Sequence, residues 1–385
     1  MATIKAVDLF AGCGGLSLGF ENAGCEIVAA FENWGLAADC YEQNFRHPVY
    51  RTDLNNVDEA VSIIQALDIN MIIGGPPCQD FSHAGKRVEA SRASLTESYA
   101  QIISKIKPKY FLMENVDRAQ KSQAYATARE IYKESGYGIT ERVLTASYCG
   151  VPQRRKRFFC IGILGEEDGV LDAILSKNLS NTEMTLRDYF GDSLDIEFYY
   201  RHPRNYSRRG VFSIDEPAPT MRGVNRPVPK GYPGHPKDAG PVTQDLRPLT
   251  TLERSLVQTF PSNFKWVGSK TDREQMVGNA VPVNLGTYVA KALIEHIEQS
   301  EYHDSEIDSA LFQEWLSAEK GLSERSSRDT VSRLSRANKL HPLSSETDLQ
   351  TYIFELGRKP DFESLSPSVR SQLKRAVKLY SEFRN

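Results

Sequence analysis

The sequence predicts an α/β fold with a mainly parallel, doubly wound sheet, followed by a small loop-rich domain and an all-helical C-terminal appendage. The main observation is an alternation of apolar runs and helical patterns in the first half of the chain. Six runs have the length and composition of strands: IKAVDLF, CEIVAAF, INMIIGG, PKYFLMEN, GITERVLTA and RFFCIGIL. Segments between them, such as GLSLGFENAG and LTESYAQIISKIK, have the spacing of amphipathic helices.

The second observation is a change of composition from about residue 185 to residue 270. Stretches such as RHPRNYSRRG and DEPAPTMRGVNRPVPKGYPGHP are rich in proline, glycine, arginine and tyrosine, and the alternation stops there. Such a segment is loop-rich or partly disordered. A helical pattern returns in VPVNLGTYVAKALIEHIEQ, and helical periodicity continues after the polar stretch SEYHDSE. We therefore expect four segments: 1–185, 186–272, 273–300, which returns to the first domain, and 305–385.

Composition and charge limit the classes of function. The chain of 385 residues has a formal net charge of -3, so any nucleic-acid site must be a local basic patch. The six cysteines form no CxxC pair, which favours reduced thiols over a disulfide framework or a zinc site. No apolar stretch has the length of a membrane span, and the N-terminus lacks the pattern of a signal peptide. We expect a cytoplasmic protein.

The first unusual stretch is DLFAGCGGLSLGF, a glycine-rich turn between a predicted strand and a predicted helix. Gly12 and Gly14 match the start of a dinucleotide-binding GxGxxG pattern, but Ser17 occupies the position of the third glycine. Glu32 and Asp53 follow the next two apolar runs, where a carboxylate can bind ribose hydroxyls. Together these residues favour an adenosine-type cofactor, although each acid alone is more typical of a solvated loop.

The stretch GGPPCQDFS places Cys78 directly after two prolines at the end of a predicted buried strand. A free cysteine is most often a small buried apolar residue. Here Pro76 and Pro77 stiffen the loop and remove hydrogen-bond donors, and a thiolate presented at a ligand crevice is a strong nucleophile. Both interpretations stay open from this stretch alone.

A carboxylate and a run of cations follow later strands. Glu114 and Asn115 come after the apolar run PKYFLM. Burial would raise the pKa of the Glu114 carboxyl and suit a proton donor, unless backbone amides satisfy the carboxylate. The run RRKR at 154–157 is typical of a solvated face, but near Glu114 its cations can bind phosphate or orient the carboxylate.

These stretches, in this order, resemble the DNA cytosine methyltransferases that modify carbon 5 of cytosine. The matching motifs are DLFAGCGG, FENW, GGPPCQDFS, MENV, GVPQRRKR, RPLTTLERSLVQTFP and GNAVPVN, which span residues 1 to 298. The resemblance implies a Rossmann-like S-adenosylmethionine-dependent methyltransferase fold, with 1–185 as the catalytic and cofactor-binding domain and 186–272 as the target recognition domain. It also implies the methyl donor S-adenosyl-L-methionine, the product S-adenosyl-L-homocysteine, and no metal.

The resemblance implies a role for each matching residue. Cys78 would be the nucleophile that adds to a flipped-out cytosine, and Glu114 with Asn115 would form the acid site, supported by Arg155 and Arg157. The cofactor would contact Phe10, Ala11, Gly12, Gly14, Leu16, Glu32, Asn33, Asp53, Leu54, Pro77, Leu95, Asn279 and Val281. The family often has a large side chain stacking on adenine where this chain has Asn33, with Trp34 one position later, so the stacking partner stays open. DNA would be contacted by Gln79, Ser82, Arg201, Arg204, Arg208, Arg209, Thr220 and Arg222.

The function that the resemblance implies is sequence-specific methylation of double-stranded DNA, in a bacterial restriction-modification or defence system that can include a cognate endonuclease. Three alternatives are an RNA-modifying relative, a catalytically inactive DNA-binding paralogue and a nicotinamide oxidoreductase. The basic segment after residue 164 argues against the first alternative. Intact Cys78, Glu114 and Arg155 argue against the second, and the missing third glycine with the Pro-Pro-Cys loop argues against the third.

The C-terminal segment lies outside this resemblance. The stretches GLSERSSRDTVSRLSR and SVRSQLKRAVKLYSEF resemble the helical core-binding module of phage-type integrases. Basic residues on both stretches are consistent with DNA binding. A helical packing or oligomerisation unit is equally consistent with the pattern.

Overall fold

The computed structural model describes residues 4–77, 95–205, 207–305, 309–343 and 348–384, and the statements below concern those residues. The chain divides into two compact units, residues 2–293 and residues 294–385. The boundary falls within helix α10 (Val283–Ser305). The domain boundaries expected from the sequence at residues 185, 272 and 300 remain predictions.

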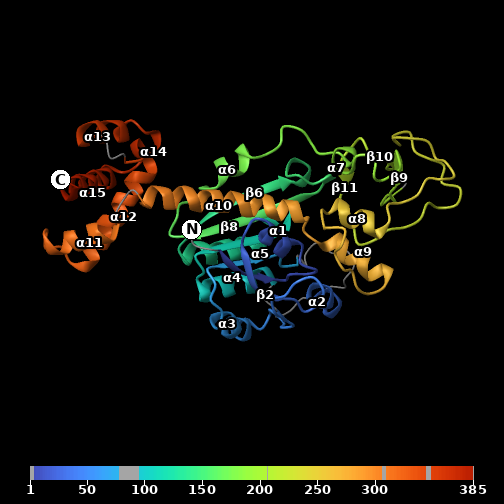
Figure 1. The fold of residues 1–385 in the computed structure, drawn as a ribbon, viewed down its shortest axis with the longest axis horizontal. Coiled ribbons are helices and arrows are strands. Elements are labelled where there is room, and N and C mark those ends of the chain that lie inside the picture. The colour runs from blue at the N-terminus through green and yellow to red at the C-terminus, as the bar shows by residue number, and fades with distance from the viewer. Residues whose placement is uncertain (1–3, 78–94, 206, 306–308, 344–347, 385) are drawn as a thin grey trace. The chain divides into compact units, whose positions relative to one another are not determined.

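A β-sheet forms the centre of residues 2–293 (Figure 1). It has seven strands in the order β3-β2-β1-β4-β5-β8-β6. Its strands are β1 (Lys5–Leu9), β2 (Glu26–Phe31), β3 (Val49–Tyr50), β4 (Met71–Gly74), β5 (Tyr110–Val116), β6 (Tyr137–Thr145) and β8 (Lys156–Leu164). Neighbouring strands from β3 to β5 pair in parallel, and β8 runs antiparallel to both β5 and β6. All six predicted runs are strands, and the mainly parallel sheet is confirmed.

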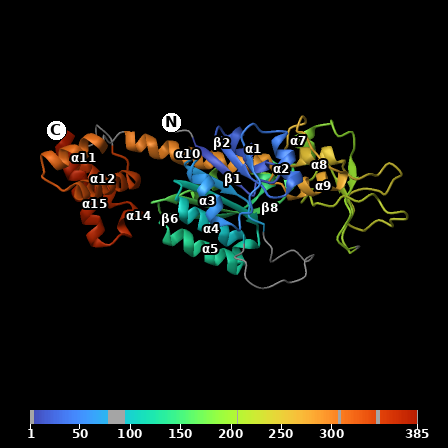
Figure 2. The same cartoon turned by 90° about the horizontal axis from the view of Figure 1, so that it is seen from below.

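Helices cover both faces of this sheet. The helices are α1 (Gly15–Asn22), α2 (Gly35–Glu42), α3 (Val57–Gln65), α4 (Leu95–Ile106), α5 (Gln123–Glu134) and α10, with 3₁₀ turns η2 (Ala119–Lys121) and η3 (Ala146–Tyr148). Figure 2 shows α3, α4 and α5 together along one side, where they share a core with Val7, Leu9 and Phe31. On the other side α2 packs near Ala30, and α1 approaches α10 so closely that Gly19 has no room for a Cβ. The result is a doubly wound α/β layer structure.

The order in which successive strands are added to the sheet reverses between β1 and β4. After β1 the chain adds β2 and β3 on one side, and it then returns to place β4 and β5 on the other. In such sheets a crevice opens beyond the carboxyl ends of the two strands at the reversal. The residues after β1 and β4 are therefore placed to bind a ligand.

The segment between β8 and α10 is loop-rich, as its composition predicted. Its elements are α6 (Asp172–Lys177), α7 (Leu186–Phe190), β9 (Phe198–Tyr200), β10 (Val211–Ser213), β11 (Ala218–Pro219), α8 (Thr251–Val257) and α9 (Lys270–Asn279). β9 and β10 form an antiparallel pair, and β11 pairs with β7 (Gln153–Arg154). Two small apolar clusters, around Phe212 and around Tyr232, hold the segment together.

The unit formed by residues 294–385 is all-helical over the residues described. It comprises the end of α10 and α11 (Ser309–Ala318), α12 (Glu324–Leu340), α13 (Leu349–Gly357), α14 (Pro360–Glu363) and α15 (Pro367–Arg384). Its own apolar core contains Phe312, Leu334, Tyr352, Phe362 and Tyr380. None of the described helices of the chain is long and apolar enough to cross a bilayer.

Candidate active site

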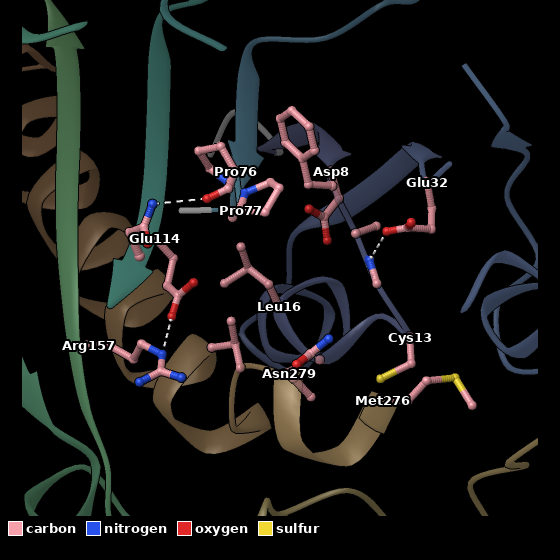
Figure 3. A pocket seen from close by; sticks show the side chains of 18 of the residues that line it. Asp8, Cys13, Leu16, Glu32, Pro76, Pro77, Glu114, Arg157, Met276 and Asn279 are labelled. Atoms are coloured by element: carbon pink, nitrogen blue, oxygen red, sulfur yellow. Dashed lines mark hydrogen bonds and ion pairs between the residues drawn. The ribbon is translucent and has the colours of Figure 1, made fainter. Parts of the chain in front are cut away.

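A cavity of about 510 Å³ lies at the carboxyl ends of the central strands. The segments after β1, β2 and β4 and the end of β5 line it, and the end of α9 with the connection to α10 lines its other side (Figure 3). A second cavity of about 340 Å³ shares Phe10, Glu32 and Pro77 with the first. The two cavities therefore meet where the strand order reverses, between β1 and β4.

The turn after β1 leaves open space at Gly12. Phe10, Gly12 and Gly14 have φ angles of 60°, 57° and 92°. A Cβ added to Gly12 would meet no described atom within 4 Å, whereas a Cβ on Gly14 would lie 2.3 Å from the ring of Phe45. Gly14 is therefore required by packing, while Gly12 keeps the cavity accessible to a ligand.

Glu32 is held between two turns of the cavity wall. Its Oε2 accepts a 2.7 Å hydrogen bond from the backbone N–H of Gly12, and its Oε1 accepts one of 2.7 Å from Trp34. Burial raises the pKa of the Glu32 carboxyl, and these N–H groups offset part of the rise. Each oxygen has a further lone pair, so the carboxylate can still accept from ligand hydroxyls.

Twelve of the thirteen residues expected at the cofactor line one of the two cavities. The first cavity is lined by Phe10, Ala11, Gly12, Leu16, Glu32, Pro77, Asn279 and Val281, and the second adds Asn33, Asp53, Leu54 and Leu95. Gly14 lines neither cavity and instead occupies the tight turn before α1. Trp34 lines the first cavity and Asn33 the second, so both candidates for the stacking position lie beside ligand space.

The sequence analysis missed Asp8, which also lines the first cavity. Its carboxylate is 1% exposed and accepts a 2.6 Å hydrogen bond from the hydroxyl of Ser17. Ser17 accepts a 2.6 Å bond from Tyr41, whose hydroxyl lies 2.7 Å from Nε2 of His47. Burial raises the pKa of Asp8 to about 7. The serine at the place of the third glycine was the available signal, because its hydroxyl contacts the acid nine positions earlier.

Glu114 lies near the carboxyl end of β5, lines the cavity and forms an ion pair with Arg157. The distance between Oε1 of Glu114 and Nε of Arg157 is 2.7 Å, and the two side chains are 9% and 13% exposed. Burial raises the pKa of the Glu114 carboxyl, and the positive charges of Arg157 and Arg155 oppose the rise. Among the residues that the structure describes, the carboxylate is therefore held by a guanidinium and not by a set of backbone amides. A proton can be held at this carboxyl more readily than at an exposed glutamate.

Asn115 connects β5 to the loop after β4. Its Nδ2 donates a 2.9 Å hydrogen bond to the carbonyl oxygen of Pro76, and its Oδ1 accepts from the backbone N–H of Val116. Pro76 and Pro77 line the cavity. Cys78, Gln79 and Ser82 lie outside the described residues, so the predicted nucleophile is placed only through the prolines that precede it.

The four cations of the run 154–157 have four different surroundings. Arg154 forms an exposed ion pair with Glu183 at 2.5 Å. Arg155 is 1% exposed and donates to the carbonyl oxygens of Met221 at 3.1 Å and Gly278 at 3.0 Å. Lys156 is exposed, and Arg157 contacts Glu114. Burial and the charge of Arg157 lower the pKa of Arg155. Its hydrogen bonds join the run 154–157 to the segments that contain Met221 and Gly278, beside the cavity.

The cations expected at DNA fall into separate groups. Arg201 and Arg222 line a small third cavity, and Arg201 donates to the carbonyl oxygen of Thr220 at 2.8 Å. Arg204 and Arg208 are exposed. Arg209 forms an ion pair with Glu216 at 2.5 Å and lies over the ring of Phe212, which ties it to the local core.

Arg254 belongs to the same group but was not singled out from the sequence. It lines the third cavity beside Arg201 and Arg222 and forms an ion pair with Glu274. Burial lowers the pKa values of Arg201 and Arg254 to about 10, and repulsion by Arg222 adds to the effect. Cations crowded in this way favour an anionic ligand nearby. Only the three-dimensional proximity reveals the group, because its members are up to 53 positions apart.

Within the residues that the structure covers, no group of three or more histidine, cysteine, aspartate or glutamate side chains is arranged to hold a metal ion. The candidate site therefore consists of the two joined cavities, the Glu114–Arg157 pair and the arginine group.

In a comparison with known protein families, residues 4–295 match the C-5 cytosine-specific DNA methylases. The chain is 57% identical over 293 residues to the Type II methyltransferase M.HindV of Haemophilus influenzae, covering 76% of this chain and 96% of that protein. It is 54% identical over 297 residues to the Type II methyltransferase M.HgiDI of Herpetosiphon aurantiacus, covering 77% and 96%.

Among solved structures, the S. pombe Dnmt2 methyltransferase superposes with a TM-score of 0.56 and 18% identity. The superposition covers 77% of this chain and 99% of that one. At this identity the likeness concerns the fold, which agrees with the predicted Rossmann-like methyltransferase architecture.

Proposed function

The chain belongs to the C-5 cytosine-specific DNA methylase family, and from that premise we propose that it methylates carbon 5 of a cytosine flipped out of double-stranded DNA at a specific sequence. The methyl donor is S-adenosyl-L-methionine. The observation that carries the proposal is the Glu114–Arg157 pair, which lies in the same cavity as Glu32 and the open turn at Gly12. An acid for the base and a subsite for an adenosine-type cofactor thus share one space.

The residues present fit S-adenosyl-L-methionine. Glu32 has acceptor capacity for ribose hydroxyls, Asp53 lines the adjoining cavity, and Trp34 offers an aromatic face. The space next to Gly12 admits a ligand close to the backbone. When bound, the cofactor would supply an electrophilic methyl group, and no metal is required for this chemistry. The side product would be S-adenosyl-L-homocysteine.

The protein residues make the base reactive. Carbon 5 of cytosine is a weak nucleophile, and addition of the Cys78 thiolate to carbon 6 would convert the ring to an enamine. Glu114 would protonate or hydrogen-bond ring nitrogen 3, while Arg157 holds the carboxyl in place. After methylation, loss of the carbon-5 proton would expel the thiol and restore the ring. A stacked base is inaccessible to these groups, so the cytosine must leave the duplex.

The structure supports different roles for the cations around the site. Arg155 would position the cavity wall, since it is buried on the carbonyl groups of Met221 and Gly278. Arg201, Arg204 and Arg222 would face DNA phosphates, because they crowd positive charge in one place, whereas Arg254 is buried in its ion pair with Glu274. Arg208 would join them from its exposed position, whereas Arg209 is engaged with Glu216. Thr220, Gln79 and Ser82 remain proposed DNA contacts, and residues 186–272 the proposed target recognition domain.

The relatives named Type II methyltransferases supply the biological setting of the proposal. The chain would act in the bacterial cytoplasm on nucleoid DNA, beside an endonuclease that cuts the same unmethylated sequence.

The proposal is tested by incubating the protein with labelled S-adenosyl-L-methionine and either duplex DNA or tRNA. We expect label in DNA only, at one sequence that bisulfite sequencing identifies. The Cys78→Ser variant should bind that DNA but transfer no methyl group. Label confined to tRNA, or full turnover by Cys78→Ser, would contradict the proposal.

A further inference from the structure

The charges of the C-terminal helices are sorted by element. Helix α12 carries five basic and two acidic residues, and α15 carries five basic residues and one acidic residue. Helices α11, α13 and α14 carry four acidic residues together and no basic residue. The two basic helices pack against each other, so the unit concentrates positive charge on one contacting pair.

The basic residues of α12 form a stripe along its outer side. Arg325, Arg328, Arg336 and Lys339 are spaced by 3, 8 and 3 positions, which places them on one face of a helix. The opposite face buries Thr330, Leu334 and Ala337. From Arg325 to Lys339 the stripe is about 21 Å long at 1.5 Å per residue. One acid, Asp329, lies near the stripe, and Glu324 pairs with Arg328 at 3.2 Å.

Helix α15 presents its cations in the same manner. Arg370, Lys374 and Lys378 are four positions apart and share a side, with Arg375 exposed beside them. The side turned to the core buries Leu373, Ala376, Val377 and Tyr380. Lys374 lies over the ring of Phe362, so its stem is fixed while its charge remains near the surface. In the described part of the chain Arg325, Arg375 and Lys378 take part in no ion pair. Folding of the unit therefore does not explain these cations.

The unit is an addition to the methylase fold. The family match ends at residue 295. Two Type II methyltransferases are matched over 96% of their own length, so enzymes of this kind do not need the C-terminal unit. Residues 294–385 carry 13 basic and 16 acidic residues, so the positive charge is a local feature of α12 and α15 and not of the unit as a whole. A duplex carries one negative charge per about 1.7 Å of axis, so a row of cations about 21 Å long can lie along several successive phosphates.

We propose that α12 and α15 form a second DNA-contact surface, which binds the phosphodiester backbone of duplex DNA without reading its sequence. The proposal goes beyond the methyl-transfer function, because it concerns helices outside the methylase match. Phosphate contacts of this kind add affinity at all sequences and release condensed counterions. The surface would keep the enzyme on DNA while the catalytic unit meets its target.

The experiment uses the full-length chain and a duplex of A·T pairs only, which contains no cytosine in either strand. The test variant carries Arg325→Gln, Arg328→Gln and Arg375→Gln. The control variant carries Lys320→Gln, Arg358→Gln and Lys359→Gln, which removes the same charge from the connections of the same unit. Circular dichroism and thermal melting establish that both variants are folded.

We expect the test variant to bind the A·T duplex at least about tenfold more weakly than wild type at 0.1 M salt, with the control variant near wild type. The slope of log Kd against log salt should fall by about 0.9 for each phosphate that the variant no longer neutralises. Equal slopes for wild type and test variant, or an equal loss of affinity in the control variant, would overturn the proposal.

Two further measurements distinguish DNA binding by this surface from a role in catalysis and from self-association. Methyl transfer at saturating cognate DNA should keep its kcat in the test variant, and binding to the A·T duplex is informative even if the chain methylates no DNA. Analytical ultracentrifugation tests a second copy of the chain as the occupant of the surface. A changed mass with an unchanged salt slope would assign α12 and α15 to self-association and refute DNA binding.

Discussion

The side-chain amide of Asn115 donates a 2.9 Å hydrogen bond to the carbonyl oxygen of Pro76, which joins the end of β5 to the loop after β4. In the sequence, Pro76 stands two positions before Cys78, the proposed nucleophile. The bond is buried, so it fixes Pro76 relative to the end of β5, where Asn115 is the neighbour of the proposed acid, Glu114.

Replacing Asn115 by alanine should therefore lower turnover more than binding. Loss of one buried hydrogen bond weakens the loop conformation by about 1–2 kcal/mol, so kcat should fall by roughly tenfold while the KM for S-adenosyl-L-methionine changes little. Steady-state kinetics measures both. Asn284→Ala is the matched control, because its amide makes a 2.8 Å bond to the carbonyl of Gly150 away from the cavity. An equal loss of kcat in the control would assign the effect to stability.

Removal of Arg157 should move the pH profile of the enzyme. The guanidinium holds the pKa of Glu114 below the value that burial alone would give. In Arg157→Gln the pKa of Glu114 should rise, and a carboxyl that acts in its protonated form then stays active to higher pH. We expect a lower maximum of kcat and an alkaline limb shifted upward. An alkaline limb that stays in place or moves to lower pH would contradict a protonated Glu114.

The same profile in Glu114→Gln gives the reference. This variant cannot release a proton from the side chain, so its alkaline limb should no longer report this group. We expect kcat to fall by about 10²–10⁴-fold, the usual contribution of a positioned acid. Wild-type turnover in Glu114→Gln would remove the acid from the mechanism.

Replacing Gly12 or Gly14, two glycines of the same turn, by alanine should have different effects on cofactor binding and on stability. Gly12→Ala adds a methyl group to the open cavity and strains a φ of 57°, at a cost of about 1–2 kcal/mol. Gly14→Ala drives a Cβ into the ring of Phe45. We expect Gly12→Ala to raise the Kd for S-adenosyl-L-methionine with a modest loss of stability, and Gly14→Ala to lower the melting temperature more. Calorimetric titration and thermal melting separate the effects, and the reverse order would contradict this assignment.

The sequence predicts the parts of this protein that depend on local patterns. Six apolar runs give six strands, and an acid directly after such a run identifies Glu32 and Glu114. The antiparallel direction of β8 was not predicted, because strand direction depends on how β6 and β8 pair through the turn at η3. A local pattern contains no information about that pairing.

Contacts between distant positions account for most of what was missed. The run at 154–157 is chemically uniform in the sequence, yet Arg155 is buried and Arg154 is exposed because neighbouring residues face different sides. Arg254 meets Glu274 and lies beside Arg201 only in the folded chain. Asp8 lies within β1, whereas Ser17, which donates to it, and Tyr41, which donates to Ser17, come from two different helices.

Asp8 should make the stability of the protein fall as pH rises. Burial raises the pKa of its carboxyl to about 7, from 3.8 in an unfolded chain, while the hydroxyl of Ser17 opposes part of the rise. Between these values the folded state keeps a proton that the unfolded state has lost, so the free energy of unfolding decreases with pH and levels off above about 7. The difference corresponds to about 4 kcal/mol at pH 8.

The Asp8→Asn variant removes this titration. We expect it to be more stable than wild type at pH 8, with the gap closing as pH falls toward 4, measured by urea unfolding at intervals of pH. Asp168→Asn is the control of opposite sign, because, against the effect of partial burial, Lys133 and the N–H of Ile139 lower the pKa of Asp168. That variant should be less stable than wild type at neutral pH, with its gap closing in acid. A pH-independent difference for Asp8→Asn would show that the buried carboxyl does not titrate in this range.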